Sequence, residues 1–434
     1  MRAAILAIGD ELTCGYRLDT NSQAISRRLS AVPVDVIMHL TVNDDLEAIR
    51  QGLRTVLGVA DVLVVTGGLG PTEDDLTRQA IADYFGLELV EDAGALARIR
   101  ARFAHRGRKM PDGNRIQAQV PAGSQIIYND RGTAAGFYLP VGEGVPAPLL
   151  TGGIDGAKHI FVTPGIPWEM EGMLEAFILP RLQEMAGAGR YVRRAVLKVY
   201  GIPESEINER VRPMLTRGRN PLLGLLPSRG TITVEVVASA SAPEEAEALI
   251  ERDLIGLRAE LGPFVISEDE RELPQVVADL LVEQGLTVAT VELGTGGLVA
   301  ARLTEPQGSE RWFRRSIIFG SDQEAAGRKP TSSLPREDEV LAMANAVRQA
   351  AEVDVGVGVG AICVPEDSTS ERPYGVVRAA VNVQGRETCR RFSFNGDHAR
   401  VREWAADSAL ALVRLCLLGL ESYGERGVPV CETR

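Results

Sequence analysis

Residues 61–80 read DVLVVTGGLGPTEDDLTRQA, an apolar run followed by a glycine-rich turn and a helical pattern. The apolar run predicts a buried strand, and the residues from about Thr72 to Tyr84 predict a helix. The three glycines of the turn permit positive φ angles and let the backbone approach a ligand closely. Because the first N–H groups of a helix are free and carry partial positive charge, this turn suits an anion such as phosphate.

Strand and helix patterns alternate on both sides of this stretch. The expected elements before it are strands at 2–9 and 32–42 and helices at 21–31 and 45–60. Residues 92–158, which are rich in Gly, Pro and Asn, predict loops with an edge hairpin, and a strand near 160 ends in a Pro-Gly turn. Such alternation favours right-handed crossovers and a mostly parallel sheet, the α/β fold class.

Two further units follow in the chain. The second combines a strand, a turn and a helix at 191–211 with an alternating strand at 231–240 and an amphipathic helix at 242–261. The third begins near 270 and closes with a helical pattern at 405–415. We therefore expect an α/β domain at 1–175, a small α+β middle domain at 176–267 and an α/β C-terminal domain at 268–424.

Acidic pairs follow three of the expected strands. They are Asp10 with Glu11, Asp44 with Asp45, and Asp74 with Asp75. Carboxyl ends of parallel strands share one edge of a sheet, where ligands bind. A divalent cation such as Mg²⁺ would relieve the repulsion between these acids and bind a phosphate. The alternative is that they cap helices, because Asp is a favoured N-cap residue and Thr72 to Asp75 fits a capping box.

Composition limits the class of protein. The chain has 434 residues, a net charge of −12, 45% hydrophobic and 24% charged residues, as in a soluble globular protein. The acidic balance argues against a nucleic-acid partner. The five cysteines form no CxxC pair and predict reduced thiols in a cytoplasm, and the four histidines lack zinc spacing. No apolar run of ~18 residues predicts a membrane span.

The first ~170 residues resemble the MoaB/Mog-type molybdopterin-binding fold, in the form found in the CinA (competence/damage-inducible) family. The matching stretches are AILAIGDELTCGYRLDTNSQAISRRL (4–29), VNDD (42–45), TGGLGPTEDDLTRQA (66–80), NDRGTAAGF (129–137) and VTPGIPWEME (162–171). The segments GIPESEINERV and GLLPSRGTITVEVVASA also resemble the middle of that family. The resemblance implies a three-layer N-terminal domain, a small middle domain, a C-terminal CinA-type domain and a homodimer or larger homo-oligomer.

The same resemblance implies metal-dependent hydrolysis of ADP-ribose or a related nucleotide diphosphate, with Mg²⁺ or Co²⁺. Asp44 and Asp75 are the expected catalytic and metal-binding residues, joined at the metal by Asp10, Glu11 and Asp74. The expected ligand-binding residues are Gly67, Gly68, Gly70 and Thr72 at the phosphates, Asn129, Gly132 and Thr133 along the pocket, and Pro164 and Gly165 at its far wall. Asp10 and Glu11 have a second interpretation, as caps or partners of Arg17. Related proteins bind a pterin phosphate with this loop, so non-catalytic binding of molybdopterin or a nucleotide stays open.

The C-terminal domain resembles nicotinamide mononucleotide deamidases but lacks the residues that carry their chemistry. The family's nucleophilic serine, tyrosine and lysine positions hold Leu293, Gly320 and Ala325 here. A serine hydroxyl needs a base, and Ser309 would have neither partner. We expect no deamidase activity; the alternative, an active deamidase, would need a substitute nucleophile such as Ser321 or Thr295. The retained glycines of ELGTGG (292–297) fit either close helix–strand packing or nucleotide binding.

Overall fold

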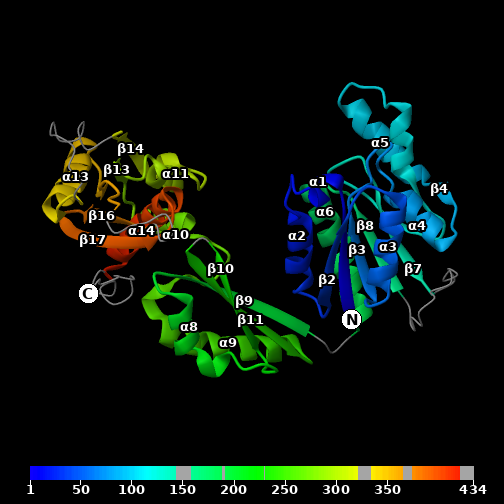
Figure 1. Cartoon of the computed structure of the whole chain (residues 1–434), viewed down its shortest axis with the longest axis horizontal. Coiled ribbons are helices and arrows are strands. Elements are labelled where there is room, and N and C mark those ends of the chain that lie inside the picture. The colour runs from blue at the N-terminus through cyan, green and yellow to red at the C-terminus, as the bar shows by residue number, and fades with distance from the viewer. Residues whose placement is uncertain (143–157, 188–190, 229, 321–333, 365–373, 421–434) are drawn as a thin grey trace. The chain divides into compact units, whose positions relative to one another are not determined.

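The computed structural model describes residues 1–142, 158–187, 191–228, 230–320, 334–364 and 374–420 of the chain. It comprises two compact units, one formed by Met1–Arg193 with Ser239–Glu247 and the other by Arg194–Ala238 with Ala248–Arg434 (Figure 1). Strands and helices alternate along most of the chain, so the expected α/β fold class is confirmed. No helix in these described ranges is long and apolar enough to cross a membrane.

The first unit is built on a six-stranded sheet of order β2-β1-β3-β8-β7-β6. Its strands are β1 (Arg2–Ile8), β2 (Asp35–Val42), β3 (Val62–Thr66), β6 (Gln125–Ile127), β7 (Gly136–Val141) and β8 (Lys158–Thr163). The first four strands in that order are parallel, and β6 and β7 form the antiparallel edge hairpin expected from the sequence. The mostly parallel sheet is therefore confirmed, and the carboxyl ends of β2, β1, β3 and β8 share one edge.

Helices cover both faces of this sheet (Figure 1). One face carries α2 (Thr20–Leu29), α6 (Pro167–Met173) and α7 (Leu179–Ala186), and the other carries α3 (Leu46–Leu57) and α4 (Thr77–Phe85). The period of two along β1 explains the division, because Ala3 and Ile5 pack in the core with α2 whereas Ala4 and Leu6 pack in the core with α3. The sheet therefore has one hydrophobic core on each face, and the two helix layers with the sheet between them form three layers.

Several boundaries differ from the expectation: β2 begins at Asp35 and not at 32, and α14 spans His398–Leu418 and not 405–415. The difference at the glycine turn matters most for the site. The pattern from about Thr72 predicted a helix start there, whereas α4 begins at Thr77. The residues between belong to an extended turn that is closed by the side chain of Asp75. This unit also contains α1 (Asp10–Thr13), β4 (Leu89–Glu91), α5 (Ala93–His105) and β5 (Gln119–Pro121).

A four-stranded sheet of order β10-β11-β9-β12 follows. Its elements are β9 (Tyr191–Tyr200), α8 (Glu204–Arg210), β10 (Leu222–Ser228), β11 (Thr231–Ala240), α9 (Pro243–Leu261) and β12 (Val265–Ser267). Apolar residues of both helices pack on one face of this sheet: Ile207 of α8 and Leu257 of α9 share a core with Val234 and Val236 of β11. This is the small α+β module.

The last sheet has the order β14-β13-β15-β16-β17, with three parallel strands followed by two antiparallel ones. Its strands are β13 (Val288–Glu292), β14 (Phe313–Ile318), β15 (Val355–Val359), β16 (Tyr374–Val383) and β17 (Arg386–Asn395). The helices are α10 (Leu273–Glu283), α11 (Leu298–Thr304), α13 (Glu337–Ala350) and α14 (His398–Leu418). Helices α10, α11 and α14 share one core, and α13 packs on the opposite face.

Candidate functional site

The glycine turn after β3 has a backbone that only glycine accommodates. Gly67 and Gly68 have φ angles of +107° and +64°. A Cβ on Gly67 would collide with the carbonyl oxygen of Ile8 at the end of β1, and one on Gly68 would collide with the hydroxyl of Thr77. The turn therefore lies directly against the end of the neighbouring strand, at the edge where the acidic pairs lie.

Asp75 binds the turn from within. Its carboxylate accepts the N–H of Gly70 at 2.6 Å and the N–H of Thr72 at 2.8 Å, and it also accepts the Thr72 hydroxyl. The N–H of Gly67 donates to the carbonyl of Thr163 at 3.1 Å. Three backbone donors that the sequence assigned to phosphate are thus engaged inside the protein, and the geometry gives Asp75 a loop-positioning role. The physical reason is proximity, because Asp75 is only three to five residues from Thr72 and Gly70, and the parallel strand β8 places Thr163 next to Gly67.

Arg78 binds the carbonyl groups of the same turn. The sequence analysis did not identify it as a site residue. Its side chain is 1% exposed and donates to the carbonyls of Leu69 and Gly70. Burial lowers the pKa of its guanidinium to about 10, although the charge of Asp75 acts in the opposite direction. The available signal was helical spacing: Arg78 is three and four residues before the buried Ile81 and Ala82, so it lies on the inward face of α4.

Asp10 and Asp44 form a reciprocal pair at the ends of β1 and β2. The N–H of Asp10 donates to Asp44 at 2.9 Å, and the N–H of Asp44 donates to Asp10 at 3.1 Å. Burial raises the pKa of Asp44, the N–H of Asp10 opposes this, and the charges of Asp10, Glu11 and Asp74 raise it further. The charges of Asp10, Glu11 and Asp74 therefore all act on the carboxylate of Asp44, so each acidic pair places at least one carboxylate near the others.

Asp45, the neighbour of Asp44, caps a helix, as the alternative interpretation of the acidic pairs predicts. Asp45 is the N-cap of α3, where its carboxylate accepts the N–H groups of Glu47 at 3.0 Å and Ala48 at 2.9 Å. Within the described ranges, no group of three or more His, Cys, Asp or Glu side chains is arranged to hold a metal ion. The Asp10–Asp44 pair does fit a hard cation that takes its other ligands from water and a phosphate, as Mg²⁺ commonly does.

The Pro164–Gly165 turn contacts the glycine turn. A Cβ on Gly165 would lie 3.4 Å from the Cα of Gly67. Asn21 of α2 joins the two turns, because its amide nitrogen donates to the hydroxyl of Thr66 and to the carbonyl of Gly165, both at 2.9 Å. Its amide oxygen is buried and has no hydrogen-bond partner. Asn21 is a second residue that sequence reasoning missed, since nothing local marks its long-range contacts.

The loop of Asn129 lies beside α6 instead of contacting the glycine turn directly. The Asn129 oxygen accepts the N–H of Gly132 at 2.6 Å, and its nitrogen donates to the buried Glu169 at 2.6 Å. Gly132 packs so closely on Glu169 that a Cβ would collide with the carboxylate, whereas Thr133 is half-buried. Asn129 and Glu169 line a polar cavity of about 340 Å³. This loop joins the site through α6, which begins just after the Pro164–Gly165 turn.

In the C-terminal domain, the turn at 292–297 is occupied by the chain's own carboxylate. Glu292 is completely buried and accepts the N–H groups of Gly297 at 3.0 Å, Val299 at 3.1 Å and Ala300 at 2.8 Å. The hydroxyl of Thr295 adds a fourth bond at 2.7 Å. These donors at the start of α11 are therefore satisfied within the protein.

The glycines around this turn are explained by packing. A Cβ on Gly294 would lie 2.7 Å from the nitrogen of Ile362, and one on Gly297, at φ +94°, would lie 2.8 Å from the side chain of Ile318. Of the two interpretations of the retained glycines, this geometry favours close helix–strand packing.

The lost deamidase positions carry no reactive group. Leu293 is half-buried, and Gly320 is exposed just beyond β14. Ser309 begins a short 3-10 helix, and Trp312 belongs to the core, where its indole N–H donates to the carbonyl of Leu303 at 3.0 Å. Ala325 and Ser321 lie outside the described residues.

Comparison with known families matches nearly the whole chain in three parts. Residues 4–184 match a probable molybdopterin binding domain. Residues 194–266 match the damage-inducible protein CinA KH domain, and residues 270–326 and 331–417 match the CinA C-terminal domain.

Individual relatives also match nearly the whole chain. A CinA-like protein of Dictyoglomus thermophilum is 34% identical over 97% of this chain and 100% of its own. A putative competence-damage inducible protein of Desulforudis audaxviator is 36% identical over 95% of this chain and 98% of its own. Among solved structures, the protein CinA of Thermoplasma acidophilum is 31% identical, covers 42% of this chain and 97% of its own, and superimposes with a TM-score of 0.36.

Proposed function

The chain belongs to the CinA family, and on this premise we propose that its N-terminal domain binds and hydrolyses a nucleotide diphosphate of the ADP-ribose class. The observation that carries the proposal is the reciprocal Asp10–Asp44 pair beside the glycine turn. Two acids held together at the ligand-binding edge of a parallel sheet cost stability, which is typical of a site kept for chemistry.

The glycine turn contributes shape and rigidity. Gly67 and Gly68 let the turn close against the end of β1 and the start of α4, because a Cβ on either would collide with Ile8 or Thr77. Asp75 and Arg78 hold the turn from two sides, one through its N–H groups and the other through its carbonyls. In this proposal, the diphosphate lies beside Gly67, Gly68, Gly70 and Thr72 and is bound chiefly through the cation, because Asp75 and Thr163 already accept the N–H groups of Gly67, Gly70 and Thr72. Asp75 orients the turn. The loop of Asn129, Gly132 and Thr133 and the Pro164–Gly165 turn bound the ligand.

A divalent cation such as Mg²⁺ or Co²⁺ would be held by Asp10 and Asp44, with Glu11 and Asp74 nearby. When bound, it would neutralise charge on the diphosphate and lower the pKa of a water ligand. Asp44 has a second role only where it is not a ligand. If Asp10, Glu11 and Asp74 hold the cation, the Asp44 carboxylate can accept a proton from the attacking water.

The test is AMP release from ADP-ribose by the full chain with Mg²⁺ or Co²⁺. Asp44→Asn should reduce turnover by roughly 10²-fold or more, as expected for loss of a general base or cation ligand. Asp35→Asn is the matched control, because Asp35 begins β2 whereas Asp44 follows the end of that strand, at the opposite edge of the sheet. Unchanged turnover in Asp44→Asn would reject the assignment.

A second candidate is binding of a molybdopterin or nucleotide without turnover. It is favoured by the match of residues 4–184 to a probable molybdopterin binding domain and by the internal hydrogen bonds of Asp75. Calorimetric titration of ADP-ribose into the same metal-loaded chain separates the two candidates: binding without AMP release supports this one. A third candidate, nicotinamide mononucleotide deamidation, lacks a nucleophile at Leu293.

A further inference from the structure

Large apolar side chains are exposed in the two segments that Asn21 joins at the rim of the candidate site. Tyr16 and Leu18, which precede α2, are almost fully exposed. Ile166 and Trp168, at the start of α6, are also exposed. Both segments lie beyond the carboxyl ends of strands of the first sheet (Figure 1). Exposed apolar side chains gathered at a ligand-binding edge indicate a binding surface.

The backbone of Trp168 is fixed, whereas 62% of the residue's surface is exposed. The Trp168 carbonyl accepts the guanidinium of Arg131 at 2.8 Å. The next two residues are buried: Glu169 accepts a hydrogen bond from Asn129, and Met170 belongs to the core beneath α6. Among the described residues, no hydrogen bond or aromatic contact holds the indole. Trp168 therefore presents an open aromatic ring on a rigid turn.

Trp168 is within reach of a ligand at the glycine turn. Gly165 packs against Gly67, because a Cβ on Gly165 would lie 3.4 Å from the Gly67 Cα. Trp168 follows Gly165 by three residues, so their Cα atoms are at most about 11 Å apart. In a nucleotide of the ADP-ribose class, a ribose separates the diphosphate from the purine. A diphosphate beside the glycine turn can therefore extend its base to the indole.

The other residues of the proposed site offer no surface for such a base. They are glycines, carboxylates, threonines, Asn129 and Pro164, and none of them is aromatic. A purine is planar, and its faces are most favourably covered by another aromatic ring. The position of Trp168, between the Pro164–Gly165 turn and the loop of Asn129, places such a ring at the boundary of the ligand.

We propose that the indole of Trp168 stacks on the base of the nucleotide and thereby selects ligands that carry a fused aromatic ring. Leu18 and Ile166 extend the apolar rim beside it. This inference rests on the proposed nucleotide site but not on hydrolysis, because a base stacks whether or not the diphosphate is cleaved.

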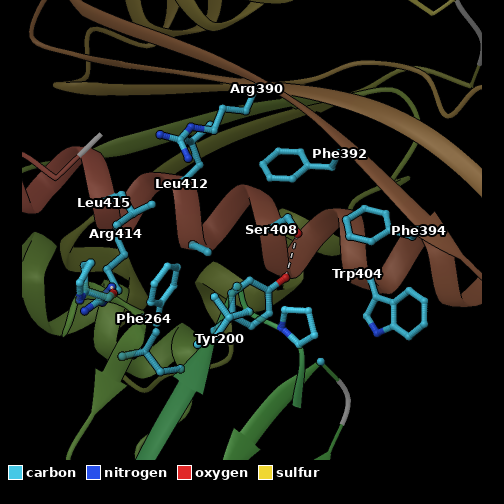
Figure 2. Close-up of a pocket in the computed structure, with 17 residues that line it drawn as sticks. Tyr200, Phe264, Arg390, Phe392, Phe394, Trp404, Ser408, Leu412, Arg414 and Leu415 are labelled. Carbon is cyan, nitrogen blue, oxygen red and sulfur yellow. Dashed lines mark hydrogen bonds between the residues drawn. The ribbon is translucent and has the colours of Figure 1, made fainter. Parts of the chain in front are cut away.

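The other two tryptophans of the chain lie in the second unit. Trp312 is buried in its core. Trp404 lines an apolar cavity of about 220 Å³ between α14, β17 and the end of β9, beside Phe394 (Figure 2). Because a stacked base quenches indole fluorescence, a quench that arises at Trp168 should disappear in Trp168→Phe and persist in Trp404→Phe.

The test titrates the full chain, with Mg²⁺ present, with AMP and with ribose 5-phosphate, which differ only in the base. AMP should quench the fluorescence and bind at least ~10-fold more tightly by calorimetry, a ratio that corresponds to ~1.4 kcal/mol. Trp168→Ala should remove most of this preference, because the base loses its stacking partner, and should leave the affinity for ribose 5-phosphate unchanged. Trp168→Phe should retain part of it. Ile255→Ala is the matched control, a similarly exposed apolar residue (60%) in the other unit, and should change neither affinity.

Equal affinity for the two ligands, no binding of either, or a preference that survives Trp168→Ala would each overturn the inference, also where ADP-ribose hydrolysis is observed. Loss of a dimer in Trp168→Ala with unchanged AMP affinity, measured by light scattering, would overturn it and assign the surface to a second copy of the chain. Quenching by AMP that depends on Trp168, without turnover of ADP-ribose, would support the stacking site and reject the hydrolase.

Discussion

The N–H of Asp10 donates to the carboxylate of Asp44, and the N–H of Asp44 donates back to Asp10, at 2.9 Å and 3.1 Å. Thirty-four residues separate them in the chain, and the parallel pairing of β1 with β2 brings them together. The two backbone bonds hold like charges side by side. Replacing either acid should therefore affect stability and reactivity in opposite directions.

Asp44→Asn should raise the melting temperature at pH 7, by no more than about 2 °C for this partly exposed group. Burial raises the folded-state pKa of Asp44 above the ordinary value for an aspartate, about 3.9, so ionisation opposes folding. The cost is absent below that value, grows as the pH rises through the folded pKa, and is fully present at neutral pH. Calorimetry from pH 4 to 7 should show the gain growing with pH; a gain that is constant across this range would contradict it.

Asp75→Ala should raise the KM for ADP-ribose about tenfold with little change in kcat, corresponding to ~1.4 kcal/mol of lost ligand positioning. The reason is that Gly70 and Thr72 lose the acceptor that fixes their N–H groups. Glu73→Ala, an exposed neighbour in the same turn, serves as control. The measurement is steady-state AMP release, which gives kcat and KM separately. A large loss of kcat with unchanged KM would indicate that Asp75 is a catalytic residue.

Arg78→Met should destabilise the first unit by about 1–3 kcal/mol, because the carbonyls of Leu69 and Gly70 lose a buried donor. The measurement is thermal unfolding together with amide hydrogen exchange across 66–75, which should accelerate. Arg54→Met, an exposed arginine on α3, is the matched control. Unchanged thermal stability and unchanged amide hydrogen exchange in Arg78→Met would show that the turn is stable without the Arg78 side chain.

Glu292→Gln should destabilise the second unit by roughly 1.5–3 kcal/mol, the range for buried hydrogen bonds to a charged group. The amide turns one acceptor into a donor that faces the N–H groups of Gly297, Val299 and Ala300. Urea unfolding followed by circular dichroism measures the change, with Glu283→Gln on the surface of α10 as control. Equal midpoints for the two variants would mean that this carboxylate does not stabilise the turn.

Leu293→Ser should release no ammonia from nicotinamide mononucleotide. The new hydroxyl would have no base, since the tyrosine and lysine positions of the family hold Gly320 and Ala325. An ammonia assay on the purified variant and on the unaltered chain should match a blank. Turnover by the unaltered chain would point to another nucleophile, such as Ser321 or Thr295.

The sequence by itself determined the α/β class, the mostly parallel first sheet and the absence of a serine at position 293. These features depend on local properties of the sequence. The periodicity of apolar side chains distinguishes strands from helices, and the glycines permit the tight turn after β3. The chemistry available at a position depends on which residue is there. The acids at the ends of β1, β2 and β3 were also placed correctly at one edge, because parallel strands with crossovers end on the same side.

Only the tertiary structure decided which group each acid and cation contacts. Asp75 turned inward to its own loop, Glu292 filled the start of α11, and Arg78 became buried under the glycine turn. Tyr200 and Ser408, which are 208 residues apart, came within hydrogen-bonding distance at a cavity that no sequence motif marks. The physical reason is that a charged side chain binds whichever donor or acceptor lies within about 3 Å, and long-range packing alone sets that distance.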